Sequence, residues 1–238
     1  MKSIWHITKK EFVSYFTSPI AYVAIAVFLV VVGLKFFVVD EFFDEGRASV
    51  RSLFTLLPIF FMFYLPAITM KLITEEKTSG TFELLMTLPL TDAQIILGKF
   101  FGALGFLLVT LLFTLAYPLL VGALGAPDVG TIVASYVGII LLGAAYIAVG
   151  IMTSSWSGNQ IVSYVLAAVI CAFLYFQDAL VGIFWGGAKR FMEFRSFSAH
   201  YSNFLRGVLD SRDLLFFVSA IALALLVGVW SLNKRRWN

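Results

Sequence analysis

The chain has 238 residues, of which 61% are hydrophobic and 13% charged, and its mean hydropathy is +0.95. Soluble domains average about 45–50% apolar and about 25% charged residues, so a water-soluble fold is excluded and a lipid bilayer is the expected solvent. The formal net charge of +3 is spread along the chain and gives no reason to propose nucleic acid as a partner, and the single cysteine, Cys171, excludes an intrachain disulfide.

Residues 1–18 predict an amphipathic helix at the membrane surface. They lack the apolar core and small-residue cleavage site of a signal peptide. At about 100° per residue, apolar and polar side chains fall on separate arcs. The apolar arc holds Ile4, Trp5, Phe12, Tyr15 and Phe16, and the polar arc holds Lys2, His6, Lys9 and Lys10. We expect this helix to lie in the membrane plane with its lysines toward anionic headgroups; packing on a partner protein is the alternative.

Six stretches are long and apolar enough to cross a bilayer, whose core of about 30 Å needs about 20 helical residues. They are predicted at 19–39, 52–72, 94–124, 129–153, 159–178 and 213–233. Lys35 lies near the far end of the first stretch, where its ammonium can reach the interface; a functional charge inside the membrane is the alternative. The predicted fold is a single domain, 1–238, of the all-α polytopic membrane class.

The distribution of basic residues predicts that both termini are cytoplasmic. Lysines and arginines precede the first span, follow the last, and flank the connection between spans two and three. They are Lys2, Lys9, Lys10, Lys71, Lys77, Lys99, Lys234, Arg235 and Arg236. One segment conflicts with this rule, because 186–212 is expected on the outer face and yet is basic. Its basic residues are Lys189, Arg190, Arg195, Arg206 and Arg212.

Aromatic residues recur at steps of three and four within 186–212, which predicts short outer amphipathic helices before the last span. They are Phe191, Phe194, Phe197, Tyr201 and Phe204. We expect these rings to anchor the helices in the outer leaflet; a lid over a substrate is the alternative.

The connection 75–90 carries more charge and more helix-breaking residues than a plain loop needs. Thr91 and Gln94 match a capping box that starts the third span, and Gly80 ends the element before it. The helix left between them, 81–87, has barely two turns and is too short to be stable alone. The membrane surface or another protein must therefore hold it.

This connection resembles the cytoplasmic loop of ABC-2 type transporter permeases. The similarity lies in Thr-Glu-Glu-Lys at 74–77, Gly-Thr-Phe-Glu-Leu-Leu at 80–85, Pro89, and 95–99. It continues in 159–162 and 204–213, covers nearly the whole chain, and is closest to the gliding-motility (GldF-like) branch.

The resemblance implies a coupling helix that docks a separate ABC ATPase. The implied docking residues are Glu75, Glu76, Gly80, Thr81, Phe82, Glu83, Leu85, Met86 and Pro89. It also implies two ATPase copies that carry ATP and Mg, no cofactor in this chain, and a second permease as a homodimer or a related heterodimer. A bacterial cytoplasmic (inner) membrane is the implied location, surrounded by membrane lipid, and an outer-face accessory protein remains open.

Small residues form a ridge on the fifth span at Ser163, Ala167 and Cys171. The family resemblance places a permease–permease contact on spans one and five, which suits this ridge; packing within one subunit is the alternative. Pro58 and Pro66 in span two and Pro118 in span three predict kinks.

No enzyme site is indicated. The chain has no Gly-x-x-x-x-Gly-Lys-Ser/Thr run to hold nucleotide phosphates. Ser154, Ser155 and Ser157 lack a histidine in any predicted span to activate them, so we interpret them as polar loop residues. His6 and His200 are too far apart in sequence to form a helical metal pair.

The sequence therefore predicts the permease subunit of an ATP-binding cassette exporter, with ATP hydrolysis on a partner chain. The alternative is a non-transporting scaffold of a motility or envelope machine that a bound ATPase drives mechanically. Lipid, lipid-linked sugar, peptide and polysaccharide all remain open as cargo.

Overall fold

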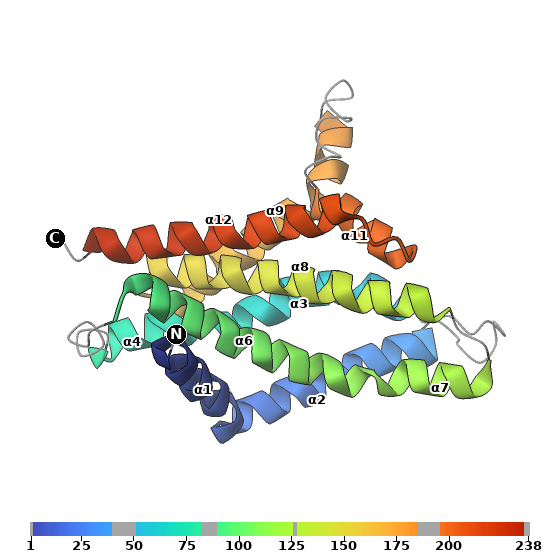
Figure 1. Cartoon of the computed structure of the whole chain (residues 1–238), viewed down its shortest axis with the longest axis horizontal. Helices are drawn as coiled ribbons and strands as arrows, with labels where there is room; N and C mark the ends of the chain where they lie inside the picture. Colours follow the sequence, from blue (N-terminus) through green and yellow to red (C-terminus); the bar gives the residue numbers. More distant parts are fainter. Residues whose placement is uncertain (1, 40–50, 82–89, 126–127, 185–195, 236–238) are drawn as a thin grey trace.

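The computed structural model describes residues 2–39, 51–81, 90–125, 128–184 and 196–235. Within these ranges the chain is helical and contains no strand. Six helices are long and apolar enough to cross a membrane, and they lie roughly side by side in one bundle (Figure 1). The predicted all-α polytopic fold with six spans is confirmed.

The chain opens with α1 (Lys2–Thr17), which turns at Ser18 into α2 (Pro19–Leu34). The Ser18 hydroxyl accepts a hydrogen bond from the Ile20 N–H at 3.4 Å, and Pro19 suits the first helical position. A short π-helical turn, η1 (Lys35–Val39), continues the span, so Lys35 lies at its end, as expected.

The helix α1 packs against another helix of the same chain, α6 (Asp92–Thr114). Three glycines of α6 make this close approach possible. A Cβ at Gly98, Gly102 or Gly105 would lie within 2.9 Å of atoms of Ile7, Glu11 or Phe12, respectively. Trp5 stays 65% exposed on the outer side of α1, so one face of this helix remains free for lipid.

The helix of the second span continues past residue 72, the predicted end of the span. It consists of α3 (Arg51–Thr69) and α4 (Lys71–Thr78), which meet at Met70. Residues 75–78 of the predicted connection are therefore helical and belong to α4. Gly80 adopts a φ of +72°, a left-handed conformation that favours glycine, and ends this element as predicted.

The third span begins as predicted. The Thr91 side chain accepts from the Gln94 N–H and the Gln94 side chain accepts from the Thr91 N–H, which completes the capping box. The span breaks at Leu115, before α7 (Ala116–Leu124). The break lies three residues before Pro118, whose ring nitrogen cannot donate to the preceding turn. At Pro58 and Pro66, by contrast, α3 continues without a break.

The fourth span, α8 (Val129–Trp156), is the centre of the bundle and the most buried of the six candidate spans. It contacts α3, α4 and α6, and it also contacts the three elements that follow it. These are α9 (Gln160–Phe184), α11 (Phe197–Leu205) and α12 (Ser211–Arg235).

A short amphipathic helix before the last span, α11, is present as predicted, but its aromatic face lies inside the protein. Phe197, Tyr201 and Phe204 are buried against the bundle, and the Tyr201 hydroxyl donates to the Phe54 carbonyl at 2.8 Å. These three rings therefore pack the protein core and do not anchor in lipid. Phe191 and Phe194 lie outside the described residues.

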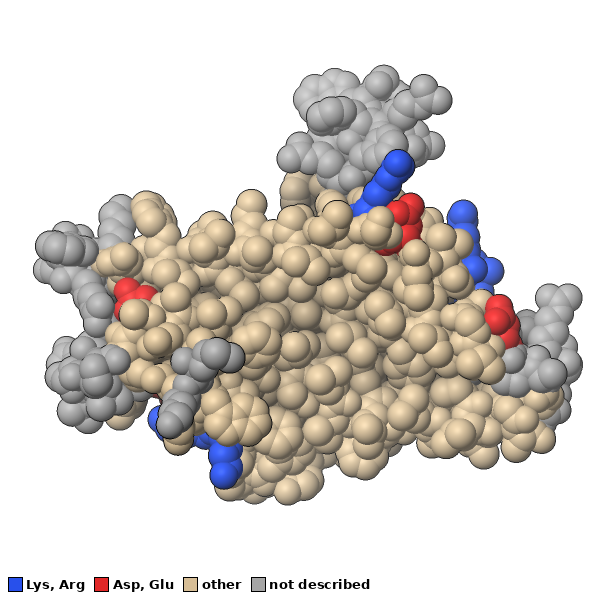
Figure 2. Space-filling model, viewed as in Figure 1, with Lys and Arg blue, Asp and Glu red and all other residues tan. Residues whose placement is uncertain are grey.

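Charged side chains gather toward the two ends of the bundle, and a broad uncharged belt separates them on the face seen in Figure 2. One end carries α4 together with the start of α1 and the end of α12, and we name it the α4 end. The other carries α7 and α11, and we name it the α11 end (Figure 1).

Candidate functional site

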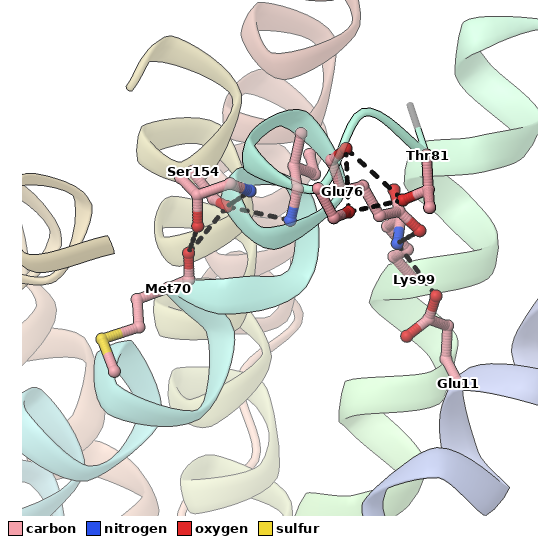
Figure 3. A network of polar contacts seen from close by, with 9 residues as sticks. Glu11, Met70, Glu76, Thr81, Lys99 and Ser154 are labelled. Carbon is pink, nitrogen blue, oxygen red and sulfur yellow. Dashed lines mark hydrogen bonds and ion pairs between the residues drawn. The ribbon is translucent and has the colours of Figure 1, made fainter. Parts of the chain in front are cut away.

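The α4 end holds a network of buried polar contacts that joins helices far apart in sequence. Figure 3 shows α4 between α8 on one side and α6 on the other, with Met70, Glu76, Thr81, Lys99 and Ser154 meeting around it. Two groups of contacts build this network. We call the pairing of Lys99 with Glu11 and Glu76 the ion-pair triad, and the hydrogen bonds between Ser154 and α4 the serine joint.

The ion-pair triad links α1, α4 and α6. The Lys99 ammonium lies 2.9 Å from Glu11 Oε1 and 2.7 Å from Glu76 Oε1. The side-chain exposure of Lys99 is 2%, against 13% for Glu11 and 18% for Glu76, so the three charges are largely removed from water. Because a buried charge needs its partners, the triad fixes the three helices relative to one another.

The serine joint fastens α4 to the end of α8. The Ser154 hydroxyl accepts from the Ile73 N–H at 3.1 Å and the Thr74 N–H at 3.2 Å, and it donates to the Met70 carbonyl at 3.0 Å. A hydroxyl offers one donor and two acceptor positions, so Ser154 uses its full capacity here. It satisfies backbone groups exposed where the helix turns at Met70 between α3 and α4.

Lys77 adds a second fastening between the same two helices. Its ammonium donates to the carbonyls of Ser155 at 2.5 Å, Ser157 at 3.3 Å and Ser154 at 3.4 Å. The last carbonyls of α8 have no partner within the helix, and they also carry its negative dipole end. A lysine is therefore well suited to cap them.

Two further contacts hold the end of α8: a close approach of α3 at Gly150 and a hydrogen bond from Ser231 of α12. A Cβ at Gly150 would lie 1.9 Å from Thr69 Oγ1, so α3 and α8 touch there only because residue 150 is glycine. The Ser231 hydroxyl of α12 donates to the Ser155 carbonyl at 3.3 Å. The end of α8 is thus tied to both α4 and α12.

The predicted docking residues divide into two sets. Glu75, Gly80 and Thr81 are exposed at the α4 end, whereas Glu76 turns inward to Lys99. The remaining predictions lie outside the described residues: Phe82, Glu83, Leu85, Met86 and Pro89. Glu76 therefore belongs to the internal network, and its expected place on a docking rim is not what the structure shows.

The small-residue ridge of α9 faces the core of the same subunit. Ser163, Ala167 and Cys171 are each no more than 1% exposed, and the hydroxyls of Ser163 and Thr153 of α8 lie 3.4 Å apart. This burial supports packing inside one subunit over a permease–permease contact through these side chains. The outward face of α9 carries larger residues, among them Ile161, Val169 and Phe173.

The sequence interpretation missed three members of the network. Ser154 and Ser155 were expected in a polar loop, yet both are fully buried in the last turn of α8. Glu11 was not singled out, although it is the only acidic residue before Asp40, just as Lys99 is the only charged residue between Asp92 and Asp128. The sole acid of a basic segment and the sole charge of an apolar segment are the signal that could have paired them.

Within the described residues, no group of three or more His, Cys, Asp and Glu side chains could hold a metal ion. The contacts at the α4 end join helices through directional hydrogen bonds that a shift of α4 would strain.

Comparison with known proteins gives one family. The model of the family described as "ABC-2 family transporter protein" matches residues 5–235. No curated protein matches the chain.

Proposed function

Because the chain belongs to the ABC-2 transporter family, we propose that it is the permease subunit of an ATP-binding cassette exporter, driven by ATP hydrolysis on a separate ATPase subunit. Family membership and six apolar helices make it a multi-pass membrane protein, and the family implies association with an ABC ATPase. Two ATPase copies carrying ATP and Mg, a second permease, and a bacterial cytoplasmic membrane with both termini inside complete the proposal. Assignment to the gliding-motility branch remains a prediction.

The observation that carries this proposal is the polar network around α4. A segment that docks an ATPase is useful only if its movement reaches the spans. Residues 82–89 begin four residues after the end of α4 at Thr78. The helix α4 is tied to α8 through Ser154 and Lys77 and to α1 and α6 through Lys99.

The network suits the transmission of force because its contacts are directional. Hydrogen bonds and ion pairs weaken steeply when donor and acceptor move out of line, and they are stronger in a site shielded from water. A displacement of α4 therefore moves its partners with it or breaks the contacts. Since α8 is the central helix, its displacement would reach α9, α11 and α12.

Docking and transmission can be separated by two sets of variants. Leu85→Asp with Met86→Asp alters the segment expected to touch the ATPase, whereas Ser154→Ala alters only the joint behind it. ATPase co-purification and ATP hydrolysis by the assembled complex are measured for each. Ser219→Ala is the matched control, because its hydroxyl bonds only within its own helix, to the Phe216 carbonyl.

We expect the double aspartate variant to lose both the bound ATPase and its stimulated hydrolysis. Ser154→Ala is expected to keep the ATPase bound while uncoupling hydrolysis from the permease. If the double variant retains a bound and fully coupled ATPase, residues 82–89 do not form the docking element and the proposal is wrong. Reconstituted vesicles that hydrolyse ATP without moving any cargo would favour the non-transporting scaffold instead.

A further inference from the structure

A polar cavity of about 540 Å³ lies between α1 and α4 at the α4 end, open to solvent on one side. Its volume falls in the range of small-molecule sites, about 300–1,000 Å³. Its charged lining residues are three lysines and three glutamates: Lys10, Lys71, Lys99, Glu11, Glu75 and Glu76. The described lining is thus electrically neutral, yet rich in both signs of charge.

The lysines and glutamates of the lining do not all form ion pairs with one another. Lys99 is bound by Glu11 and Glu76, which leaves this buried group with one excess negative charge. Lys10 and Lys71 lie within ion-pair distance of no carboxylate among the described residues. One part of the cavity wall therefore favours a cation and another part favours an anion.

Two buried polar atoms of the lining residues also lack partners. Among the described residues, neither Glu76 Oε2 nor the Tyr15 hydroxyl has a hydrogen-bond partner. Tyr15 is 5% exposed, and the Lys71 ammonium lies 5.8 Å from its ring centroid. Burial raises the pKa of Tyr15 above its ordinary value, so its hydroxyl keeps its proton and is a donor. An unsatisfied buried acceptor and donor are costly, which favours a ligand that satisfies both.

The cavity also has a defined place relative to the membrane. Ser18 and Ile20, where α1 turns into the first span, line it on one side, and Lys71, the first charged residue after the uncharged run 52–70, lines it on the other. The level at which two spans leave the hydrocarbon core is the level of phospholipid headgroups.

We propose that this cavity binds the phosphoethanolamine headgroup of one membrane phospholipid. The phosphate lies between Lys10 and Lys71 and accepts from the Tyr15 hydroxyl, while the ammonium donates to the free oxygen of Glu76. Its acyl chains continue along the apolar surface below Ile20. This site is independent of whether the chain transports a cargo.

Charge balance argues for this headgroup over related ones. The anionic headgroup of phosphatidylglycerol would meet three carboxylates with hydroxyl donors but without a positive charge. A choline headgroup carries the positive charge but has no N–H group to donate to Glu76. A phosphoserine headgroup would bring an additional carboxylate toward the three glutamates. Phosphoethanolamine has both a phosphate and an ammonium that can donate, without this extra negative charge, so it fits the charges of the wall.

The test is native mass spectrometry of the delipidated full-length chain, titrated with phosphatidylethanolamine, phosphatidylcholine and phosphatidylglycerol of identical acyl chains. We expect one phosphatidylethanolamine per chain, bound about tenfold more tightly than the other two lipids. Soluble O-phosphoethanolamine at equal concentration is expected not to displace it. If the soluble compound competes equally, the source is a free metabolite and the lipid assignment is wrong.

Variants locate the site. Lys10→Gln with Lys71→Gln should weaken phosphatidylethanolamine binding about tenfold or more, and Lys10→Arg with Lys71→Arg should restore it. Lys9→Gln is the matched control, because Lys9 neighbours Lys10 on α1 but lines a different cavity, against α6. Equal binding of the three lipids, or undiminished binding by the glutamine variant, overturns the proposal. Should the glutamine variant fail to fold, the lipid series on the unchanged chain decides alone.

Discussion

The two ends of the bundle are held together by different forces. At the α4 end, helices meet through the Glu11–Lys99–Glu76 triad and the Ser154 joint. At the α11 end they meet mainly through aromatic rings. The polar contacts there include Asp213, which accepts from Asn203 at 2.8 Å and pairs with His200 at 2.5 Å, and the Tyr201 hydroxyl, which donates to the Phe54 carbonyl. The rings at that end are Phe197, Tyr201, Phe204, Phe216 and Phe217.

This difference indicates which end is built to move. Ring packing is the sum of many small, non-directional contacts, so it changes gradually and holds its helices in place. A few buried polar contacts hold one geometry strongly and fail when it changes. We therefore expect the α4 end to switch between arrangements and the α11 end to stay fixed.

The all-or-none prediction concerns which end faces the cytoplasm. Ser79→Cys and Val208→Cys place a thiol on exposed positions at the α4 end and the α11 end, respectively. An impermeant thiol reagent added outside intact cells should label Val208→Cys and not Ser79→Cys. The native Cys171 is buried and gives little background. The reverse labelling would place the α4 end outside the cell, where a cytoplasmic ATPase could not dock.

A large stability effect is expected at the triad. Lys99→Met leaves two glutamates buried without their cation, which should lower the free energy of unfolding by about 3–5 kcal/mol. Asp213→Asn at the α11 end keeps one of the two acceptor oxygens and should cost about 1–3 kcal/mol. Denaturant unfolding in detergent, followed by tryptophan fluorescence, measures both.

Neutralising the whole triad is the control for that result. Glu11→Gln and Glu76→Gln, added to Lys99→Met, should recover most of the lost stability, because no unpaired charge remains. ATPase coupling should not recover, since the directional contacts are gone. Full recovery of coupling would show that the triad matters only for folding.

Alanine substitutions of a glycine at each end should have a smaller effect on stability, and only one of them should affect ATP hydrolysis. A Cβ at Gly150 meets Thr69 at the α4 end, and one at Gly138 meets Phe204, 2.6 Å away, at the α11 end. Alanine at either position should destabilise the fold by about 1–3 kcal/mol through overpacking. Only Gly150→Ala should also reduce permease-stimulated ATP hydrolysis.

Gly158→Ala is the matched control for both glycines, because a Cβ there meets nothing within 4 Å. Its effect on stability should stay within about 0.5 kcal/mol. Equal loss of stimulated hydrolysis in the Gly138 and Gly150 variants would mean that the two ends do not differ in the way proposed.

Features that depend on neighbouring residues could be predicted from the sequence. The six spans follow from the length of the apolar runs, because the bilayer core sets that length. The capping box at Thr91, the end of α4 at Gly80 and the break before Pro118 follow from local backbone chemistry, and the structure contains all three. Polarity alone does not mark the end of a helix, since Glu75 to Thr78 are polar and still helical.

What covers each helix face was decided only by the tertiary structure. The ridge at Ala167 and the ring of Tyr201 were recognised as distinct faces, but both turned inward, away from a second permease or lipid. In a membrane, lipid tails and protein interiors are equally apolar, so hydrophobic periodicity cannot tell them apart. The partners of Ser154 and Lys99 lie up to 84 and 88 residues away along the chain, and only the folding of α1, α4, α6 and α8 against one another brings them within hydrogen-bond distance.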